Sequence, residues 1–250
     1  MNRLENLLEE VELLDKRAYF TIDQNGIKRK EMNMAIPSLA FIKDEQLFEE
    51  ILESLVDPKE RVKLKSIDRM SSLELSKLKD NFIKIMANGD LDFSKRYGKE
   101  LALRDKESFL KLLYEISLME NIEFLKPLMA LSLEEILKTN EWNDNIWYLV
   151  ISYFTKQRFD FSGFESADTL DVSKESLMKE VLESKKYLEN KEGLALLSYV
   201  LVLQKYNYKN ENKFIFLAKD KLEKIKSMKK LKQLSEIEEK IFQSLFLKEE

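Results

Sequence analysis

Apolar side chains recur every three to four residues along almost the whole chain, with charged side chains between them. In an α-helix this spacing gathers the apolar positions on one face, which becomes buried against a neighbouring helix. Residues 43–55, 75–85 and 236–247 follow the pattern, and residues 146–154 are apolar on nearly every face. The pattern predicts an all-α protein of antiparallel helical hairpins, packed as a bundle or as a short, repeat-like α-solenoid.

Short polar motifs predict where several of these helices begin and end. A serine followed three residues later by a glutamate has the spacing of a capping box, in which the two side chains satisfy free backbone N–H groups. The chain has this spacing at Ser71–Glu74, Ser132–Glu135 and Ser235–Glu238. Asp105 is expected to open another helix, and Asn88-Gly89 is expected to end one.

The predicted exception to helix lies near residues 19–30. Two β-prone runs flank Asn25-Gly26, a dipeptide that often forms the two-residue turn of a β-hairpin. One short β-hairpin is therefore expected here, with an irregular loop as the alternative.

Residues 158–172 interrupt the helical pattern and alternate phenylalanines with acids. We expect an N-terminal helical region at 1–157, a linker-like loop at 158–172 and a C-terminal helical region at 173–250, with one continuous domain as the alternative. The acids of the loop either stay solvated or hold a divalent cation, and carboxylate oxygens suit hard cations. These acids are Asp160, Glu165, Asp168 and Asp171.

The composition agrees with a helical protein in water. Of 250 residues, 44% are hydrophobic and 35% charged, and only five are glycine and three proline, so long loops are few. The most apolar stretch, 193–203, is about half the roughly 20 residues that span a bilayer, and it is expected to be a buried core helix. The N-terminus lacks a signal pattern. We expect a cytoplasmic protein without membrane contact, and the excess of lysine over arginine suggests a bacterial source.

The chain has no histidine and no cysteine, which excludes the commonest general bases, nucleophiles and metal ligands. No nucleophile elbow, phosphate-binding glycine loop or dinucleotide fingerprint is present. We therefore predict no enzyme activity, no cofactor and no metal site. A metal-dependent hydrolase built on carboxylates is a third option behind two binding functions.

The most uneven charge lies at residues 219–232, where seven lysines face two acids, although the whole chain carries a net charge of −4. A lysine-rich helix here is predicted either to be a solvated face or to contact phosphates. Its lysines are Lys219, Lys221, Lys224, Lys226, Lys229, Lys230 and Lys232. A second basic cluster, Lys28-Arg29-Lys30, accompanies the predicted hairpin.

Two further features point to partners. Trp142 stands where a helix begins, so it either caps that helix or is exposed as an interface residue. Phe242, Leu245 and Phe246 of the final helix belong either to the core or to a homodimer contact. The leading hypothesis is a non-enzymatic, helical adaptor of bacterial or phage type that binds another protein. The alternative is a protein that binds nucleic acid or a ribonucleoprotein, for example an inhibitor of a nucleic-acid-guided complex.

Overall fold

The computed structural model describes residues 2–14, 20–23, 26–29, 31–59, 70–156 and 158–247, with backbone alone for the two strands. The chain divides into two compact units. Unit 1 comprises Met1–Leu112 and Ser132–Phe159, and unit 2 comprises Leu113–Leu131 and Asp160–Glu250. The division differs from the expected one because residues 113–131 belong with the C-terminal residues.

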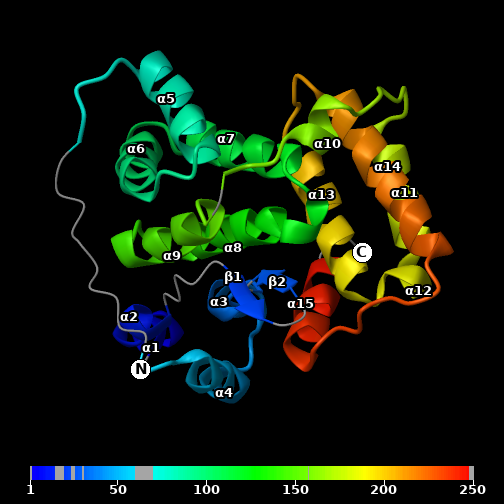
Figure 1. Cartoon of the computed structure of the whole chain (residues 1–250). Coiled ribbons are helices and arrows are strands. Elements are labelled where there is room, and N and C mark those ends of the chain that lie inside the picture. The colour runs from blue at the N-terminus through cyan, green and yellow to red at the C-terminus, as the bar shows by residue number, and fades with distance from the viewer. Residues whose placement is uncertain are drawn as a thin grey trace. The chain divides into compact units, whose positions relative to one another are not determined.

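In the described part of unit 1, the regular elements are helices and one β-hairpin (Figure 1). Its complete elements are α1 (Arg3–Glu9), α2 (Val11–Leu14), β1 (Phe20–Asp23), β2 (Gly26–Arg29), α3 (Ala35–Phe41), α4 (Glu45–Leu55), α5 (Leu75–Ala87), α6 (Leu91–Arg104) and α9 (Asp144–Phe154). Parts of α7 (Lys106–Met119) and α8 (Lys126–Thr139) complete the unit. Helices α5 and α6 are joined by a short turn and pack on each other, and α6 also packs on α9, so the predicted helix–helix packing is confirmed.

The turn between α5 and α6 follows its sequence signals. Gly89 has a positive φ of 73°, which suits glycine because it lacks a Cβ, and it ends α5 as expected. The side chain of Asp90 accepts a hydrogen bond from the Phe93 N–H at 3.1 Å and so caps α6. Asp105 accepts from the Ser108 N–H at 3.0 Å and caps α7, as predicted.

One of the three predicted capping boxes is confirmed. Ser235 and Glu238 accept hydrogen bonds from each other's backbone N–H groups, at 3.4 and 2.7 Å, at the start of α15. The Ser132–Glu135 prediction is wrong because both residues lie inside α8, which begins after Leu125 in a left-handed conformation. The Ser71–Glu74 prediction is also wrong, because Glu74 itself precedes the first residue of α5 and its side chain does not cap the helix.

The predicted β-hairpin is present. Strands β1 and β2 pair antiparallel, with Phe20 opposite Arg29 and Asp23 opposite Gly26. The pairing places Gly26 in β2, whereas Asn25-Gly26 was expected to form the turn. Asn25 lies outside the described residues.

Unit 2 is built around α13 (Lys191–Lys205), in which residues 192–203 are all buried. This confirms the predicted core helix at 193–203. Its other complete elements are the 3-10 turn η1 (Ile122–Phe124), α10 (Ser162–Glu165), α11 (Lys174–Glu183), α12 (Lys185–Leu188), α14 (Glu211–Ser227) and α15 (Glu236–Leu247), and it also contains the remaining parts of α7 and α8. Helix α13 contacts α11, α12, α14, α15 and η1.

Residues 158–172 are not a free linker. They contain α10, which packs on α14, and the rings of Phe164 and Phe214 lie 5.4 Å apart between centroids. The backbone N–H of Leu170 donates to the carbonyl oxygen of Asn212 at 3.3 Å. Among the helices that the structure describes, none is long and apolar enough to cross a bilayer.

Candidate binding surfaces

The predicted lysine-rich helix ends earlier than expected. Helix α14 stops at Ser227, and Met228 is extended with a ψ of 131°. Four of the seven predicted lysines therefore lie on α14, and Lys229, Lys230 and Lys232 lie on the connection to α15. Hydrogen bonds at the end of α14 account for the difference. The Ser227 hydroxyl donates to the carbonyl oxygen of Lys224 at 2.8 Å, which is the acceptor that the Met228 N–H would use in a continued α-helix, and that N–H donates to Ile225 at 3.3 Å instead. The connection is then held by the backbone N–H of Lys191, at the start of α13, which donates to the carbonyl oxygen of Lys232 at 2.9 Å.

The four lysines of α14 are engaged in ion pairs within unit 2. Each Nζ lies 2.5–3.5 Å from a carboxylate oxygen, and the pairs are Lys219–Glu180, Lys221–Glu123, Lys224–Asp220, Lys226–Glu180 and Lys226–Glu223. Burial alone would raise the pKa of Glu180, but the hydrogen bond from Lys226 and the charges of both its lysines outweigh burial and lower that pKa. Glu180 lies on α11, so its two lysines fasten α11 to α14. These lysines have a structural role.

Lys229, Lys230 and Lys232 are exposed, and their side chains form no ion pair with the described residues. Their segment is held at the start of α13, because Lys232 also donates its N–H to Glu192 at 3.2 Å. Helix α12, which contacts α14 and immediately precedes α13, adds Lys185 and Lys186 at this end of unit 2. We call Lys185, Lys186, Lys229, Lys230 and Lys232 the lysine surface.

The second predicted basic cluster belongs to unit 1. Lys28 and Arg29 lie in β2, opposite Thr21 and Phe20. Lys30 lies outside the described residues. For Lys28 and Arg29 the structure describes the backbone alone.

Trp142 lies half-buried in an aromatic cluster of unit 1. Its ring centroid is 5.8 Å from that of Phe109 and 5.7 Å from that of Trp147. Its indole N–H donates to Asp144 at 2.8 Å, and Asp144 also pairs with Lys99 at 2.7 Å. These contacts favour a structural role at the start of α9 over an exposed anchor.

The inner face of α6 approaches this cluster closely because its residues are small. Ser94, Gly98 and Ala102 are all buried and recur every four residues. A Cβ added at Gly98 would lie 2.2 Å from Cζ2 of Trp147, so only glycine leaves room for the ring. The Trp147 indole in turn donates to the carbonyl oxygen of Lys95 at 2.9 Å.

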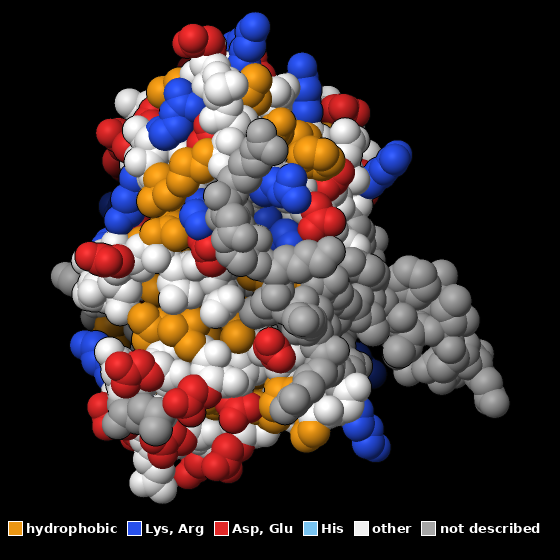
Figure 2. Space-filling view, turned by 90° about the vertical axis from the view of Figure 1, so that its left-hand side faces the viewer, with side chains coloured by type: hydrophobic (Ala, Val, Ile, Leu, Met, Phe, Trp, Pro, Cys, Tyr) orange, Lys and Arg blue, Asp and Glu red, His pale blue; other side chains and the backbone are white. Residues whose placement is uncertain are grey.

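Large side chains lie on the opposite face of α6, which sequence reasoning did not single out. Phe93 is 48% exposed and Leu103 is 52% exposed. The Phe93 ring lies 6.2 Å from the Tyr97 ring, and the Arg96 guanidinium carbon lies 6.0 Å from the Phe93 ring centroid. We call Phe93, Arg96, Tyr97 and Leu103 the outer α6 face. Apolar side chains lie between basic and acidic ones on this side of unit 1, in the upper half of Figure 2.

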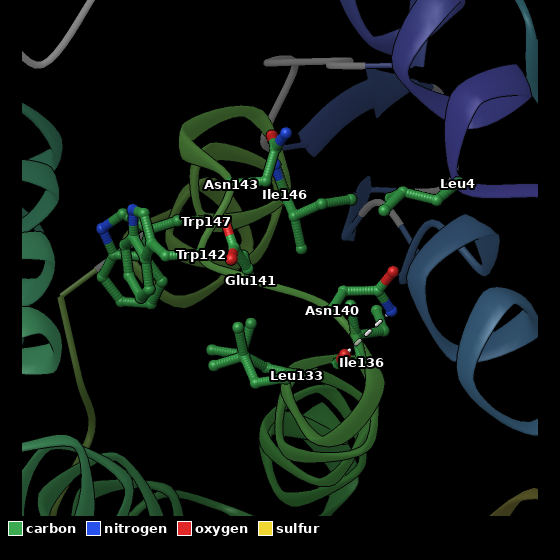
Figure 3. Close-up of a pocket in the computed structure, with 10 residues that line it drawn as sticks. Leu4, Leu133, Ile136, Asn140, Glu141, Trp142, Asn143, Ile146 and Trp147 are labelled. Carbon is green, nitrogen blue, oxygen red and sulfur yellow. Dashed lines mark hydrogen bonds between the residues drawn. The ribbon is translucent and has the colours of Figure 1, made fainter.

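Two hollows among the described residues are candidate ligand sites. One lies beside the two tryptophans in unit 1, and Figure 3 shows their indole rings side by side and turned away from Leu4. It leaves no room even for a water molecule. The other, of about 400 Å³, lies at the start of α14, where the Nζ of Lys213 already donates to the carbonyl oxygens of Phe164 and Glu165 at 3.2 Å.

The acids of residues 158–172 do not come together as a cation site. Within the described part of the chain, no three aspartate or glutamate side chains form a group that could hold a metal ion. The N–H of Asp160 donates to Glu120 at 2.9 Å, and Glu120 is buried with Lys126 in an ion pair of 2.8 Å. That buried pair anchors the segment within unit 2.

The side chains proposed for a homodimer contact belong to the core of unit 2. Phe242 is fully buried, and Leu245 and Phe246 are each 2% exposed. They are therefore unavailable to a partner unless α15 moves, and the prediction of a dimer through them is not supported.

Comparison with known proteins gives no relative: no family model, no curated protein and no solved structure matches this chain. The outer α6 face and the lysine surface are the two features of the described residues that point to a function.

Proposed function

We propose that this protein is a non-enzymatic adaptor of bacterial or phage type, acting in the cytoplasm, which binds another protein through the outer α6 face. The observation that supports this most directly is the half-exposed ring of Phe93, with Tyr97 and Arg96 beside it. Phenylalanine, tyrosine and arginine are enriched in protein interfaces, and tyrosine and arginine among their hot spots.

Burial of this face would stabilise a complex. Removing a phenylalanine side chain from water contributes about 1.5–3 kcal/mol. The helix that presents it is anchored on its other side by the contact between Gly98 and Trp147. A side chain on such a support loses little further freedom on binding, which favours affinity.

The charge on the face limits the partner's chemistry. Arg104 donates to Glu100 and to the carbonyl oxygen of Leu73, both at 2.8 Å, so its charge is satisfied. Arg96 is exposed and forms no ion pair with the described residues. A guanidinium next to aromatic rings suits a carboxylate. We infer a partner with an apolar patch that carries an aspartate or a glutamate.

The test uses the full chain as bait in extracts of the source organism. Phe93→Asp with Arg96→Glu changes the charge by −3, and Lys43→Glu with Gln46→Glu makes the same change at exposed positions before and within α4. A protein retained by the wild type and by the α4 variant, and lost with the α6 variant, would support the proposal. Equal retention by all three baits would contradict it.

Self-association is the competing outcome. Sedimentation of the purified chain distinguishes it, because a second copy of the chain would give a dimer that the α6 variant abolishes. A dimer of this kind would replace the adaptor proposal with a self-association function.

A further inference from the structure

We propose that the lysine surface of unit 2 binds single-stranded nucleic acid, with phosphates on its lysines and a base on Tyr187. The surface is separate from the outer α6 face, so this inference does not depend on the proposed function. It combines three lysines of the predicted basic segment with two lysines of α12 that sequence reasoning did not select.

Backbone contacts bring these lysines to one end of unit 2. Lys232 is fixed to Lys191 and Glu192 at the first turn of α13, and α12 ends three residues earlier at Leu188. The Asn190 side chain donates to the carbonyl oxygen of Tyr187 at 2.6 Å, which ties α12 to the start of α13. In Figure 1 the connection from α14 to α15 passes below α12.

Few neighbouring acids offset this charge. Glu192 and Glu238 are buried, and they bind the Lys232 N–H and the Lys191 Nζ. Glu123 is paired with Lys221, whose hydrogen bond lowers its pKa against the effect of burial, and the charges of Lys221, Lys232 and Lys224 lower it further.

Four exposed acids lie on the neighbouring elements. Glu183 faces Lys179 and Glu236 faces Lys240 in weak exposed pairs, and Glu189 and Glu239 are exposed and form no ion pair with the described residues. The four exposed lysines, together with the half-buried Lys185, whose Nζ lies 4.4 Å from the Phe246 ring centroid, therefore exceed the unpaired acids at this end of unit 2.

The exposed ring of Tyr187 favours single-stranded nucleic acid over other polyanions. Tyr187 is 40% exposed, and the Lys186 Nζ lies 4.8 Å from its ring centroid. Proteins that bind single strands combine cationic side chains on the backbone with aromatic rings on which bases stack. An acidic protein would use the lysines but would gain no base stacking, and the bases of a duplex are already stacked on each other.

The experiment measures fluorescence anisotropy of a labelled 15-nucleotide oligothymidine with the full chain, between 50 and 200 mM salt. Each phosphate contact on a single strand contributes about 0.7 to the slope of log affinity against log salt, so five lysines give a slope of up to about −3.5. The magnitude of this slope is expected to fall by about 2 in a triple variant that carries Lys186→Glu, Lys229→Glu and Lys230→Glu. The matched control variant, with Lys84→Glu, Lys205→Glu and Lys209→Glu, makes the same charge change at exposed positions outside the lysine surface and should retain most of the slope.

Replacement of Tyr187 separates nucleic acid from other anions. Tyr187→Ala should weaken oligothymidine binding about 5- to 100-fold, whereas Tyr187→Phe should bind like the wild type. Circular dichroism checks that each variant is folded. Three results would overturn the proposal: no binding at 50 mM salt, equal losses in the two triple variants, or displacement of the oligonucleotide by polyglutamate as readily as by unlabelled oligothymidine. The last result would assign the surface to an acidic protein instead.

Discussion

Helix α6 differs in side-chain size between the side that meets Trp147 and its outer face. Ser94, Gly98 and Ala102 line the side next to Trp147, beside the fully buried Leu101, whereas Phe93 and Leu103 are about half-exposed on the outer face. The inner face gains stability because its small residues allow the bulky Trp147 to approach. Phe93 and Leu103 are left outside, where their burial can stabilise only a complex. The comparison teaches that close packing inside can leave an aromatic surface for a partner.

The largest effect is expected where the inner face meets its neighbour. Trp147 is fully buried, and its ring lies 5.2 Å from the Phe109 ring between centroids. Trp147→Ala should reduce the free energy of unfolding of unit 1 by about 3–5 kcal/mol, because it removes the ring and leaves a cavity. Urea unfolding followed by the fluorescence of Trp142 measures this loss. A loss below about 1 kcal/mol would mean that α6 does not depend on this contact.

A smaller loss is expected from adding one methyl group to the inner face. Gly98→Ala would force its Cβ against the Trp147 ring, and overpacking of this kind costs about 1–3 kcal/mol. Gly163→Ala is the matched control, because a Cβ there meets no atom within 4 Å. Thermal unfolding of the two variants compares them. The close approach of α6 and Trp147 would be refuted if both were as stable as the wild type.

The end of α6 gives a prediction about pH. Hydrogen bonds from Ser108 and then Lys79 lower the pKa of Asp105 from its ordinary value of 3.8 to about 2. Because the folded state favours the charged carboxylate, ionised Asp105 contributes to the free energy of unfolding. That contribution is complete above about pH 4 and is lost as the pH falls through about 2. Asp105→Asn should keep the helix cap and show a smaller loss of stability over this range.

Circular dichroism measures the acid unfolding of the wild type and of Asp105→Asn, and the two unfolding curves are compared. Asp105→Ala should additionally cost about 1 kcal/mol at pH 7 because the α7 cap is removed. An Asp105→Asn variant with the same acid sensitivity as the wild type would contradict the assignment of the low pKa.

The smallest effect on stability is expected at the outer face. Phe93→Ser should change the free energy of unfolding by no more than about 0.5 kcal/mol, because surface substitutions away from packed contacts are nearly neutral. Urea unfolding compares it with Trp147→Ala. A large loss would show that Phe93 supports the fold and would remove the contrast between the two faces.

Sequence reasoning was most successful where helix signals are local. The helix at 146–154, the core helix at 193–203 and the capping box at Ser235 are all confirmed. The end of α14 was missed because no glycine or proline follows Ser227. Met228 is extended there, and the connection that follows is held by the backbone bond between Lys191 and Lys232, a contact between distant residues that local sequence signals do not show.

The outer α6 face was missed for a related reason. Periodicity alone would bury Phe93, Tyr97 and Leu101, which share one stripe of the helix, yet only Leu101 is fully buried. The signal that could have found the true inner face is the small residue at every fourth position from Ser94 to Ala102. Such spacing permits another helix to pack closely, and a large residue on that helix must then fill the space. That residue is Trp147, which the sequence pattern identified only as a core residue.

The outer α6 face is tested most directly by a photo-crosslinking amino acid, p-benzoylphenylalanine, placed at position 93 in the source organism. The same amino acid at position 84, an exposed site on α5, serves as the control. We predict one dominant protein adduct at position 93, absent at position 84 and lost when Arg96→Glu is added. No adduct at position 93, or the same adducts at both positions, would contradict the account.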